Sequence, residues 1–375
     1  MARLIATLAL ALDLVACQHT TPFPPGDYGS GQPFATGPVR RITFNLGDDR
    51  APAWLTDGSG LLYSLQHLDR PDLDRCLGLL PPGGGRLERE VCDRNLAADD
   101  STNVLTEPAA DATGRLAYLL VGSRIRDIAP GYVAVVLGTL ESPTAVRTLW
   151  IFPDTAADGV RHDEASQLRW LSPTSLVFLV EHVGYPGSPQ DTVRTGGEIA
   201  RLDLGGPAPT FAVVAGTRDA SSVAAGETPD VIYFTLGGDS RVFRQVLSTG
   251  AVSVTHDFGA AGIARDVQLA GNRLVAVVGG KVGFAFDSTF GYHVQTDQGG
   301  ELHVVDLATG MESLPAAGMF LLFRRPALAG PLARLVAEGY PYSIDSIYVG
   351  PDTMKRLVVD TVVARSADLW LVDLP

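Results

Sequence analysis

Apolar and polar residues follow two patterns that alternate along most of the chain. The first pattern is a strand, a turn and a more hydrophobic strand, and it starts at Ala51, Leu105, Leu168, Val223, Val267 and Arg325. A turn-forming pair stands in the middle of each copy, as Asp57-Gly58 does in the first. The second pattern is a hairpin in which apolar and polar residues alternate around a Gly-containing turn, and it is clearest at 197–214, 240–258 and 299–317. Together the two patterns predict units of four antiparallel strands.

Repeats of roughly 40 to 50 residues are typical of β-propellers, whose blades are four-stranded sheets set around a central channel. The six copies predict an all-β chain folded as a six-bladed propeller. Two β-sandwich domains in tandem are the alternative, but they leave the chain ends unexplained. The segment ADLWLVDLP is a third strand without its hairpin partner, and GPVRRITFNL is an outer strand with no blade before it. We therefore expect the strand from Val39 to Leu46 to pair antiparallel with the strand around Trp370 and to close the ring.

The first residues have the features of an export signal. Arg3 precedes an apolar stretch, and small residues follow before a polar, Pro-rich segment. Leu14-Val15-Ala16-Cys17 resembles the bacterial lipobox, and this resemblance implies cleavage before Cys17 and attachment of lipid to its thiol. The chain is therefore expected to divide into a signal peptide at 1–16, a flexible tether at 17–37 and the propeller domain at 38–375.

A lipid anchor makes the membrane the first expected partner, because several acyl chains hold a protein there stably. Gln18 follows the cysteine, where an aspartate would be associated with retention in the inner membrane. The expected location is thus the bacterial cell envelope, on the outer membrane, facing the periplasm or the cell surface.

One segment resembles a known propeller family. From Asp48 the chain reads DDRAPAWLTDGSGLLYS, which is similar to the repeat of TolB-type propellers: an acidic residue, proline, tryptophan, then Asp-Gly before an apolar strand. The ending LWLVDL resembles the second half of that repeat. The likeness spans residues 38–375 and is close only in the first blade. It implies a six-bladed propeller that binds proteins or ligands in the cell envelope. TolB itself has an additional N-terminal α/β domain that this chain has no room for, so a role in the Tol-Pal system is not implied.

Charge and motifs exclude several functional classes. The formal net charge is −13 over 375 residues, so nucleic acid is not an expected partner, because no basic face is available to neutralise phosphates. The sequence has no Gly-x-Ser-x-Gly elbow, no Gly-rich phosphate loop and no His-Glu-x-x-His motif. We therefore expect no catalytic residue, no metal and no cofactor.

A metal-dependent hydrolase or lyase, acting on a lactone or a sugar in the channel, is the alternative. The residues that could hold a cation are His162, Asp163, Glu164, Asp69, Asp72 and Asp74. Acidic residues in propeller loops more often form turns by accepting hydrogen bonds from nearby backbone amides. A structural role is therefore the expectation for both groups.

Cys76 and Cys92 lie at equal distances from Gly84, at the centre of a Gly- and Pro-rich hairpin. Residues directly opposite each other on antiparallel strands have Cα atoms roughly 4.5 to 5.5 Å apart, within reach of a disulfide. An exported protein lies in a compartment that permits disulfides. These positions therefore predict a structural Cys76–Cys92 bridge.

Loops that join the second and third strands of a blade all emerge on one face of the disc, and here most of them are long, including those expected at 279–300 and 339–368. This face carries aromatic and imidazole side chains, and the candidate binding residues are His67, His182, Tyr185, Phe290, Tyr292, His293, Tyr340 and Tyr342. Aromatic rings with scattered polar groups suit a protein, peptide or glycan ligand. The sequence therefore predicts a non-catalytic binding protein.

Overall fold

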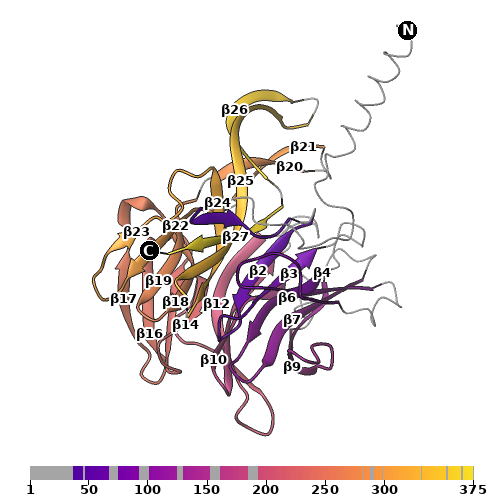
Figure 1. Ribbon diagram of the computed structural model, residues 1–375, viewed down its shortest axis with the longest axis vertical. Helices are drawn as coiled ribbons and strands as arrows, with labels where there is room; N and C mark the ends of the chain where they lie inside the picture. The colour runs from indigo at the N-terminus through magenta and orange to yellow at the C-terminus, as the bar shows by residue number, and fades with distance from the viewer. Residues whose placement is uncertain are drawn as a thin grey trace, which may run out of the picture.

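The computed structural model describes residues 37–44, 47–66, 75–92, 101–124, 130–152, 161–184, 193–280, 282–287, 291–297, 299–330, 332–351, 354–364 and 366–374. Apart from one 3-10 turn at Gly259–Ala261, the regular structure of these residues is all β, as expected (Figure 1). The described part of the chain contains no helix that could span a membrane. The expected signal peptide, Cys17 and nearly all of the tether fall outside the described residues.

Three sheets contain four antiparallel strands each, in the order expected for blades. Their strands are β10 (Arg161–Ser172), β11 (Ser175–Gly184), β12 (Val193–Asp203) and β13 (Thr210–Val213); β14 (Ala220–Ala225), β15 (Val231–Leu236), β16 (Arg241–Val246) and β17 (Ala251–Asp257); β18 (Ala264–Ala270), β19 (Arg273–Val278), β22 (Glu301–Asp306) and β23 (Glu312–Ser313). The tight turns between the first two strands fall at the turn-forming pairs that the sequence predicted.

A larger sheet combines two further units of four strands. Its strands are β2 (Asp49–Trp54), β3 (Leu61–Gln66), β4 (Arg75–Leu80), β5 (Arg89–Val91), β6 (Ser101–Ala110), β7 (Arg115–Arg124), β8 (Pro130–Thr139) and β9 (Arg147–Phe152). Only the pair Arg75 and Val104 joins β4 to β6, and it is parallel, whereas all other pairings are antiparallel. The sheet is therefore two blades in contact.

The two ends of the chain meet in the last unit, whose strand order is β24, β25, β27, β1. These strands are β24 (Leu321–Ala329), β25 (Arg334–Val349), β27 (Asp368–Asp373) and β1 (Val39–Arg41). The outer strand is shorter than expected and ends at Arg41, although the Ile42 amide still donates to the Leu369 carbonyl at 2.8 Å. Antiparallel pairing of β1 with β27 agrees with the expectation for the chain ends. The count of six blades and full closure of the ring stay predictions that these six units support.

The structure corrects the expectation that residues 279–300 and 339–368 are loops. They contain the hairpin of β20 (Val282–Asp287) and β21 (Tyr292–Asp297), and the outer part of β25 paired with β26 (Arg356–Val363). Single parallel pairs, Phe284 with Val362 and His293 with Val349, join the two hairpins. This four-stranded projection, the arm, extends from the blades at the top of Figure 1.

The core lies between the faces of neighbouring blades. One cluster joins Leu119 and Val135 of the β6–β9 unit to Phe178 and Leu202 of the β10–β13 unit, and all four side chains have no exposed surface. Burying one such side chain stabilises a fold by about 1.5–3 kcal/mol. Packing between blades thus holds the inner strands in place.

The first strand of every unit contains a β-bulge. The register shifts lie between Arg50 and Ala53, Thr106 and Ala109, Ser166 and Arg169, Ala220 and Ser222, Arg265 and Gln268, and Arg324 and Ala327. Five non-glycine residues at these bulges have φ between 45° and 55°, namely Ala51, Glu107, Gln167, Asp266 and Arg325. This left-handed conformation is costly for residues with a Cβ, so it persists only where the surroundings fix it. The bulges are therefore the places to look for fixed polar contacts.

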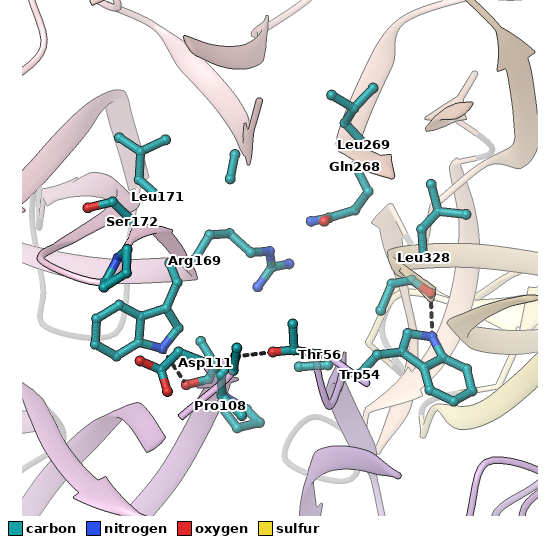
Figure 2. Close-up of a pocket in the computed structure, with 18 of the residues that line it drawn as sticks. Trp54, Thr56, Pro108, Asp111, Arg169, Leu171, Ser172, Gln268, Leu269 and Leu328 are labelled. Atoms are coloured by element: carbon teal, nitrogen blue, oxygen red, sulfur yellow. Dashed lines mark hydrogen bonds between the residues drawn. The ribbon is translucent and has the colours of Figure 1, made fainter. Parts of the chain in front are cut away.

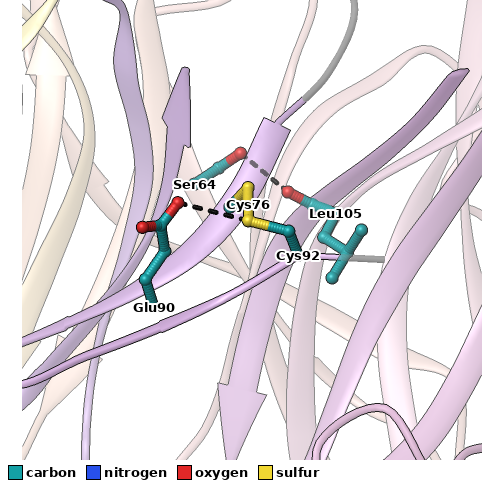
Figure 3. Close-up of a disulfide and its surroundings, with 5 residues drawn as sticks. All are labelled: Ser64, Cys76, Glu90, Cys92 and Leu105. Atoms are coloured by element: carbon teal, nitrogen blue, oxygen red, sulfur yellow. Dashed lines mark hydrogen bonds between the residues drawn. A yellow bond between two sulfur atoms is a disulfide. The ribbon is translucent and has the colours of Figure 1, made fainter. Parts of the chain in front are cut away.

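The expected disulfide is present in the first blade (Figure 3). Cys76 and Cys92 are bonded, with Cα atoms 4.5 Å apart. The register of β4 and β5, in which Leu77 opposes Val91 and Gly78 opposes Glu90, continues to this pair. Closing a loop of this length stabilises a protein by about 3 kcal/mol in the chain-entropy model. Nearby, Ser64 Oγ donates to the Leu105 carbonyl at 2.8 Å and helps to join the first two blades.

Candidate functional site

Hydrogen bonds connect the bulge of one blade to a side chain of the blade before it. In each bond a backbone amide at or next to a bulge donates to a buried polar side chain. The five pairs are Gln167 N to Glu107 Oε2 (3.0 Å), Val223 N to Gln167 Oε1 (2.9 Å), Val267 N to Ser222 Oγ (3.2 Å), Arg325 N to Asp266 Oδ2 (3.1 Å) and Ala51 N to Glu338 Oε1 (2.7 Å). These bulge bonds satisfy buried amides and explain why the left-handed residues are tolerated.

Arg325 connects two of the acceptor carboxylates. Its Nη1 lies 3.2 Å from Glu107 Oε1 and 3.6 Å from Glu338 Oε1. Burial acts to lower the pKa of the Arg325 guanidinium, but these carboxylates outweigh burial and hold the pKa above its ordinary value. The Tyr340 hydroxyl donates to Glu338 Oε2 at 3.2 Å. Burial, followed by the Glu338 charge, raises the pKa of that phenol. The centre of the molecule is thus a fixed network of charges.

A cavity of about 560 Å³ lies on one side of this network. It opens among connections between second and third strands, such as Gly237 and Gly238, and we call it the loop-side cavity. Its charged and amide lining comes from Gln167, Glu181, Asp219, Arg265, Asp266, Arg324 and Arg325. Both signs of charge thus meet in one polar space.

Asp266 is the most enclosed of these carboxylates, with 4% of its surface exposed. Its Oδ1 accepts from Gln167 Nε2 at 3.3 Å, and its Oδ2 lies 3.6 Å from Arg324 Nε. Burial acts to lower the pKa of Arg324, but the charge of Asp266, together with those of Glu338 and Tyr340, raises that pKa above its ordinary value. A carboxylate and a guanidinium are therefore held side by side at the cavity wall.

A second cavity, of about 430 Å³, lies on the opposite side of the bulges (Figure 2). Tight turns between first and second strands, which contain Thr56 and Pro173, surround its opening, so we call it the turn-side cavity. Its wall is mainly apolar, with Pro52, Trp54, Pro108, Trp170, Leu171, Leu269 and Leu328. The indole N–H groups of Trp54 and Trp170 donate to the carbonyls of Ala327 and Ala109, each at 2.9 Å. The rings are therefore fixed and offer the cavity their apolar surface.

The channel carboxylates do not form a metal site. Within the described residues, one group of three His, Cys, Asp or Glu side chains lies close enough to share an ion, and it consists of Cys76, Glu90 and Cys92. Its two sulfur atoms form the disulfide and cannot act as thiolate ligands. In the channel, Glu107 and Glu338 instead face a guanidinium.

The predicted binding residues do not form one surface. Tyr340 is only 2% exposed and belongs to the central network, because it lies in β25 inside the blade and not in a loop. His182 is on β11, where its Nδ1 lies 2.7 Å from Asp163 Oδ1 and its Nε2 lies 3.5 Å from Glu198 Oε2. Asp163, a candidate metal ligand, is thus engaged by an imidazole.

The remaining predicted residues divide between the arm and undescribed positions. Tyr342 stands at the base of the arm, with its ring 5.6 Å from that of Phe320. Tyr292 and His293 line a third cavity, of about 540 Å³, within the arm. The others, His67, Tyr185, Phe290 and the acidic group Asp69, Asp72 and Asp74, lie outside the described residues.

Sequence reasoning missed the residues at the channel centre. Glu107, Gln167 and Asp266 are polar residues in the first strands of the second, third and fifth repeats, close to where the apolar pattern begins. A comparison of the six repeats position by position would have found them. The alternation alone could not, because a bulge adds a residue and breaks the period of two.

No family model matches the chain, and no curated protein matches it. Similar solved structures are β-propellers. A gluconolactonase from Xanthomonas campestris aligns with 90% of this chain and 89% of its own, at 14% identity and a TM-score of 0.51. Regucalcin from Agrobacterium tumefaciens, described as a calcium-binding protein, aligns with 94% of this chain and 95% of its own, at 12% identity and a TM-score of 0.49. TolB from Acinetobacter baumannii aligns with 84% of this chain and 67% of its own, at 14% identity and a TM-score of 0.46. At such identities the likeness shows the fold.

These comparisons overturn the expectation that the chain is not an enzyme. One solved structure that aligns with nine-tenths of the chain is a gluconolactonase, so a propeller without a grafted catalytic domain is no argument against catalysis. The error came from relying on short motifs and on residues close together in the sequence, whereas side chains that meet in a channel come from distant strands. The narrower TolB-type assignment stays a prediction. The fold is that of a β-propeller.

Proposed function

We propose that the chain is a hydrolase of small lactones or sugar esters, with its reaction site in the loop-side cavity. The observation that carries the proposal is the Asp266 carboxylate held beside Arg324 in a polar cavity of about 560 Å³. That volume is in the range of about 300–1,000 Å³ typical of small-molecule sites.

Hydrolysis of a lactone needs a base for the attacking water and a positive group at the carbonyl oxygen. Asp266 can accept the proton of water, because among the described residues its Oδ1 accepts one hydrogen bond, from Gln167, and a carboxylate oxygen has two acceptor positions. Arg265 and Arg324 line the same cavity and can stabilise the oxyanion. The hydroxyl groups of a sugar ring can pair with Gln167 and Ser166. We assign charge stabilisation to these arginines, because they line the cavity together with Asp266.

The substrate class to test first is the aldonolactones, because the fold is shared with a gluconolactonase. Base-consumption assays with gluconolactone and other lactones should show hydrolysis above the uncatalysed rate. Asp266→Asn retains one acceptor oxygen for the Arg325 amide but loses the base, so it should lower kcat by about 10²–10⁴-fold.

A matched control is Arg244→Gln, because Arg244 pairs with Glu227 outside the cavity. Its kcat should equal that of the unaltered protein. The assay is repeated with chelator and with added divalent cations, which reveals any dependence on metal. No acceleration with any lactone, or equal rates for Asp266→Asn and the unaltered protein, would remove the proposal.

A second candidate function, contact with a partner protein, is favoured by the arm. Ile344, Tyr348, Leu357 and Val359 lie at alternating positions on paired strands, and each is more than half exposed. Neighbouring apolar side chains at this exposure are typical of interaction surfaces. Cross-linking in cell envelopes with a photoreactive residue at position 359 tests this function, and a control at exposed position 213 on β13 should give no matching product.

The lipid anchor at Cys17 remains part of the proposal. It rests on the Leu14-Val15-Ala16-Cys17 segment alone. Mass spectrometry of the mature N-terminus should find a diacylated cysteine, and Cys17→Ser should release the protein from membranes with its propeller folded.

A further inference from the structure

The turn-side cavity contains a positive charge that the proposed reaction does not use. Arg169 lies in β10 just after the bulge, and its guanidinium extends into the cavity (Figure 2). Within the described residues its side chain makes one hydrogen bond, from Nη1 to the Leu168 carbonyl at 2.8 Å. A guanidinium has five N–H donors, so most of its donors are free to bind a ligand.

The charges around Arg169 do not neutralise it directly. Glu107, the carboxylate with the largest influence on it, already pairs with Arg325 and accepts the Gln167 amide. Burial lowers the pKa of the Arg169 guanidinium, and the nearby Arg325 lowers it further, but an arginine stays charged at neutral pH. A charged group that is removed from water by burial and faces a cavity is a feature of anion-binding sites.

The other charged residue of this cavity is also already paired. Asp111 accepts from Arg115 Nε at 2.7 Å and from the amides of Thr113 and Arg115. Arg115 in turn stacks on the Trp170 ring, 4.6 Å from its centroid. The Asp111–Arg115 pair is thus neutral as a unit, and the net charge presented to a ligand is that of Arg169.

Gln268 provides the second polar contact. Its side chain extends into the cavity from the opposite wall, toward Arg169 (Figure 2). An amide and a guanidinium that face each other can both donate to the two oxygens of one carboxylate. Around them stand Trp54, Trp170 and the proline and leucine side chains, which offer apolar contact only.

From this arrangement we infer that the turn-side cavity binds a carboxylate carried on an apolar body, with Arg169 as the principal anion-binding residue. The carboxylate accepts hydrogen bonds from Arg169 and Gln268, and the apolar body packs between the Trp54 and Trp170 rings. The volume of about 430 Å³ suits a ligand such as a medium-chain monocarboxylic acid or the apolar C-terminal residue of a peptide. This site is separate from the loop-side cavity and does not depend on the proposed hydrolysis.

The test compares ligands that differ only in charge. Octanoate and octanamide are titrated into the protein, and binding is followed by tryptophan fluorescence and calorimetry. Octanoate should bind at least 10-fold more tightly than octanamide. A leucine-ended hexapeptide, with a free or an amidated C-terminus, forms the second arm and shows whether the carboxylate comes from a peptide or a free acid.

Variants locate the contact. Arg169→Gln should weaken binding of the preferred carboxylate at least 10-fold, whereas Arg169→Lys, which keeps the charge, should weaken it less. Arg201→Gln is the matched control, because Arg201 belongs to the same blade and pairs with Asp203 outside the cavity. Should Arg169→Gln fail to fold, the ligand pairs on the unaltered protein still decide the matter. Equal affinity for acid and amide in both arms, or no binding of any carboxylate at 10 mM (roughly 2.7 kcal/mol of affinity), would overturn the inference.

Discussion

The two halves of β25 show how one continuous strand can belong to two different environments. Its first half, from Arg334 to Tyr340, lies between β24 and β27, and Val336 and Ala337 have no exposed surface. Its second half continues into the arm, where Ile344 is 68% exposed. Backbone pairing is present in both halves, but in the second half only Ile347 and Val349 are buried. Backbone pairing requires only a neighbouring strand. Stability also requires side chains that are buried on the faces of the sheet.

Removal of the strand beside the buried half should have the largest effect. Ending the chain after Ser366 deletes β27, with Leu369, Leu371 and Val372, which are fully buried. At about 1.5–3 kcal/mol for each side chain, the loss is comparable to the entire stability of about 5–15 kcal/mol of a typical domain. Denaturation followed by circular dichroism should therefore show no cooperative unfolding.

The arm provides the control for that truncation. Tyr342 and Val363 are directly paired, so a two-residue Asn-Gly turn can replace residues 343–362. This deletion removes two buried side chains of the arm, Ile347 and Val349, so it should lower the free energy of unfolding by about 3–6 kcal/mol at most, and the blades should still unfold cooperatively. A truncation after Ser366 that unfolds like the intact chain would remove both ring closure and the count of six blades.

A smaller effect is expected from one carboxylate in each half. Glu338 is 1% exposed and accepts the Ala51 amide, so Glu338→Ala leaves that amide without its acceptor and removes one of the two carboxylates beside Arg325. Breaking such a pair costs about 3–5 kcal/mol. Asp345→Ala in the arm should change stability by less than about 0.5 kcal/mol. Urea denaturation of both variants measures the difference, and similar midpoints would contradict the central role of Glu338.

A titratable residue at the junction of the two halves, Asp368, should make the free energy of unfolding depend on pH. Asp368 pairs with Gly339 there, and burial raises its pKa from 3.8 to about 6, against the influence of Arg41. The folded state thus holds a proton more tightly than the unfolded state. This contribution is fully present below about pH 4 and is lost as pH rises through about 6. It amounts to about 3 kcal/mol at most. In Asp368→Asn, stability measured across this range should lack that decline, and an unchanged decline would assign it elsewhere.

The exposed half should give the smallest change in stability. Ile344→Thr and Val359→Thr keep β-branched side chains in exposed strands, so the unfolding midpoint should stay within about 0.5 kcal/mol. Binding of a hydrophobic dye should fall, because exposed apolar surface is removed. Strong destabilisation by either substitution would mean that the arm is covered by other parts of the protein.

The blades could be predicted because each repeats a strong local pattern. Alternation in strands and pairs such as Asp57-Gly58 are visible in a single sequence, and the placement of Cys76 and Cys92 about Gly84 specified their bond. The arm could not, because a four-stranded repeat has no place for additional strands, and Tyr340 was therefore assigned to a loop.

The candidate site was less accessible to sequence reasoning for a different reason. Whether the Arg169 guanidinium can bind an anion depends on the charges of Glu107 and Arg325, which belong to different blades. Whether a charged residue is exposed, paired or directed into a cavity is decided only when distant strands meet. A local pattern contains no information about that.

The bulge bonds have a consequence for how this repeat can change over evolutionary time. In each bond the donor is a backbone amide, which no substitution except proline removes. The acceptor is a single side chain, and glutamate, glutamine, serine and aspartate all serve in this chain. Neighbouring blades can therefore drift apart in sequence while the connection is kept, as it is at five of the six bulges described here, and a regular architecture is encoded by repeats that barely resemble one another.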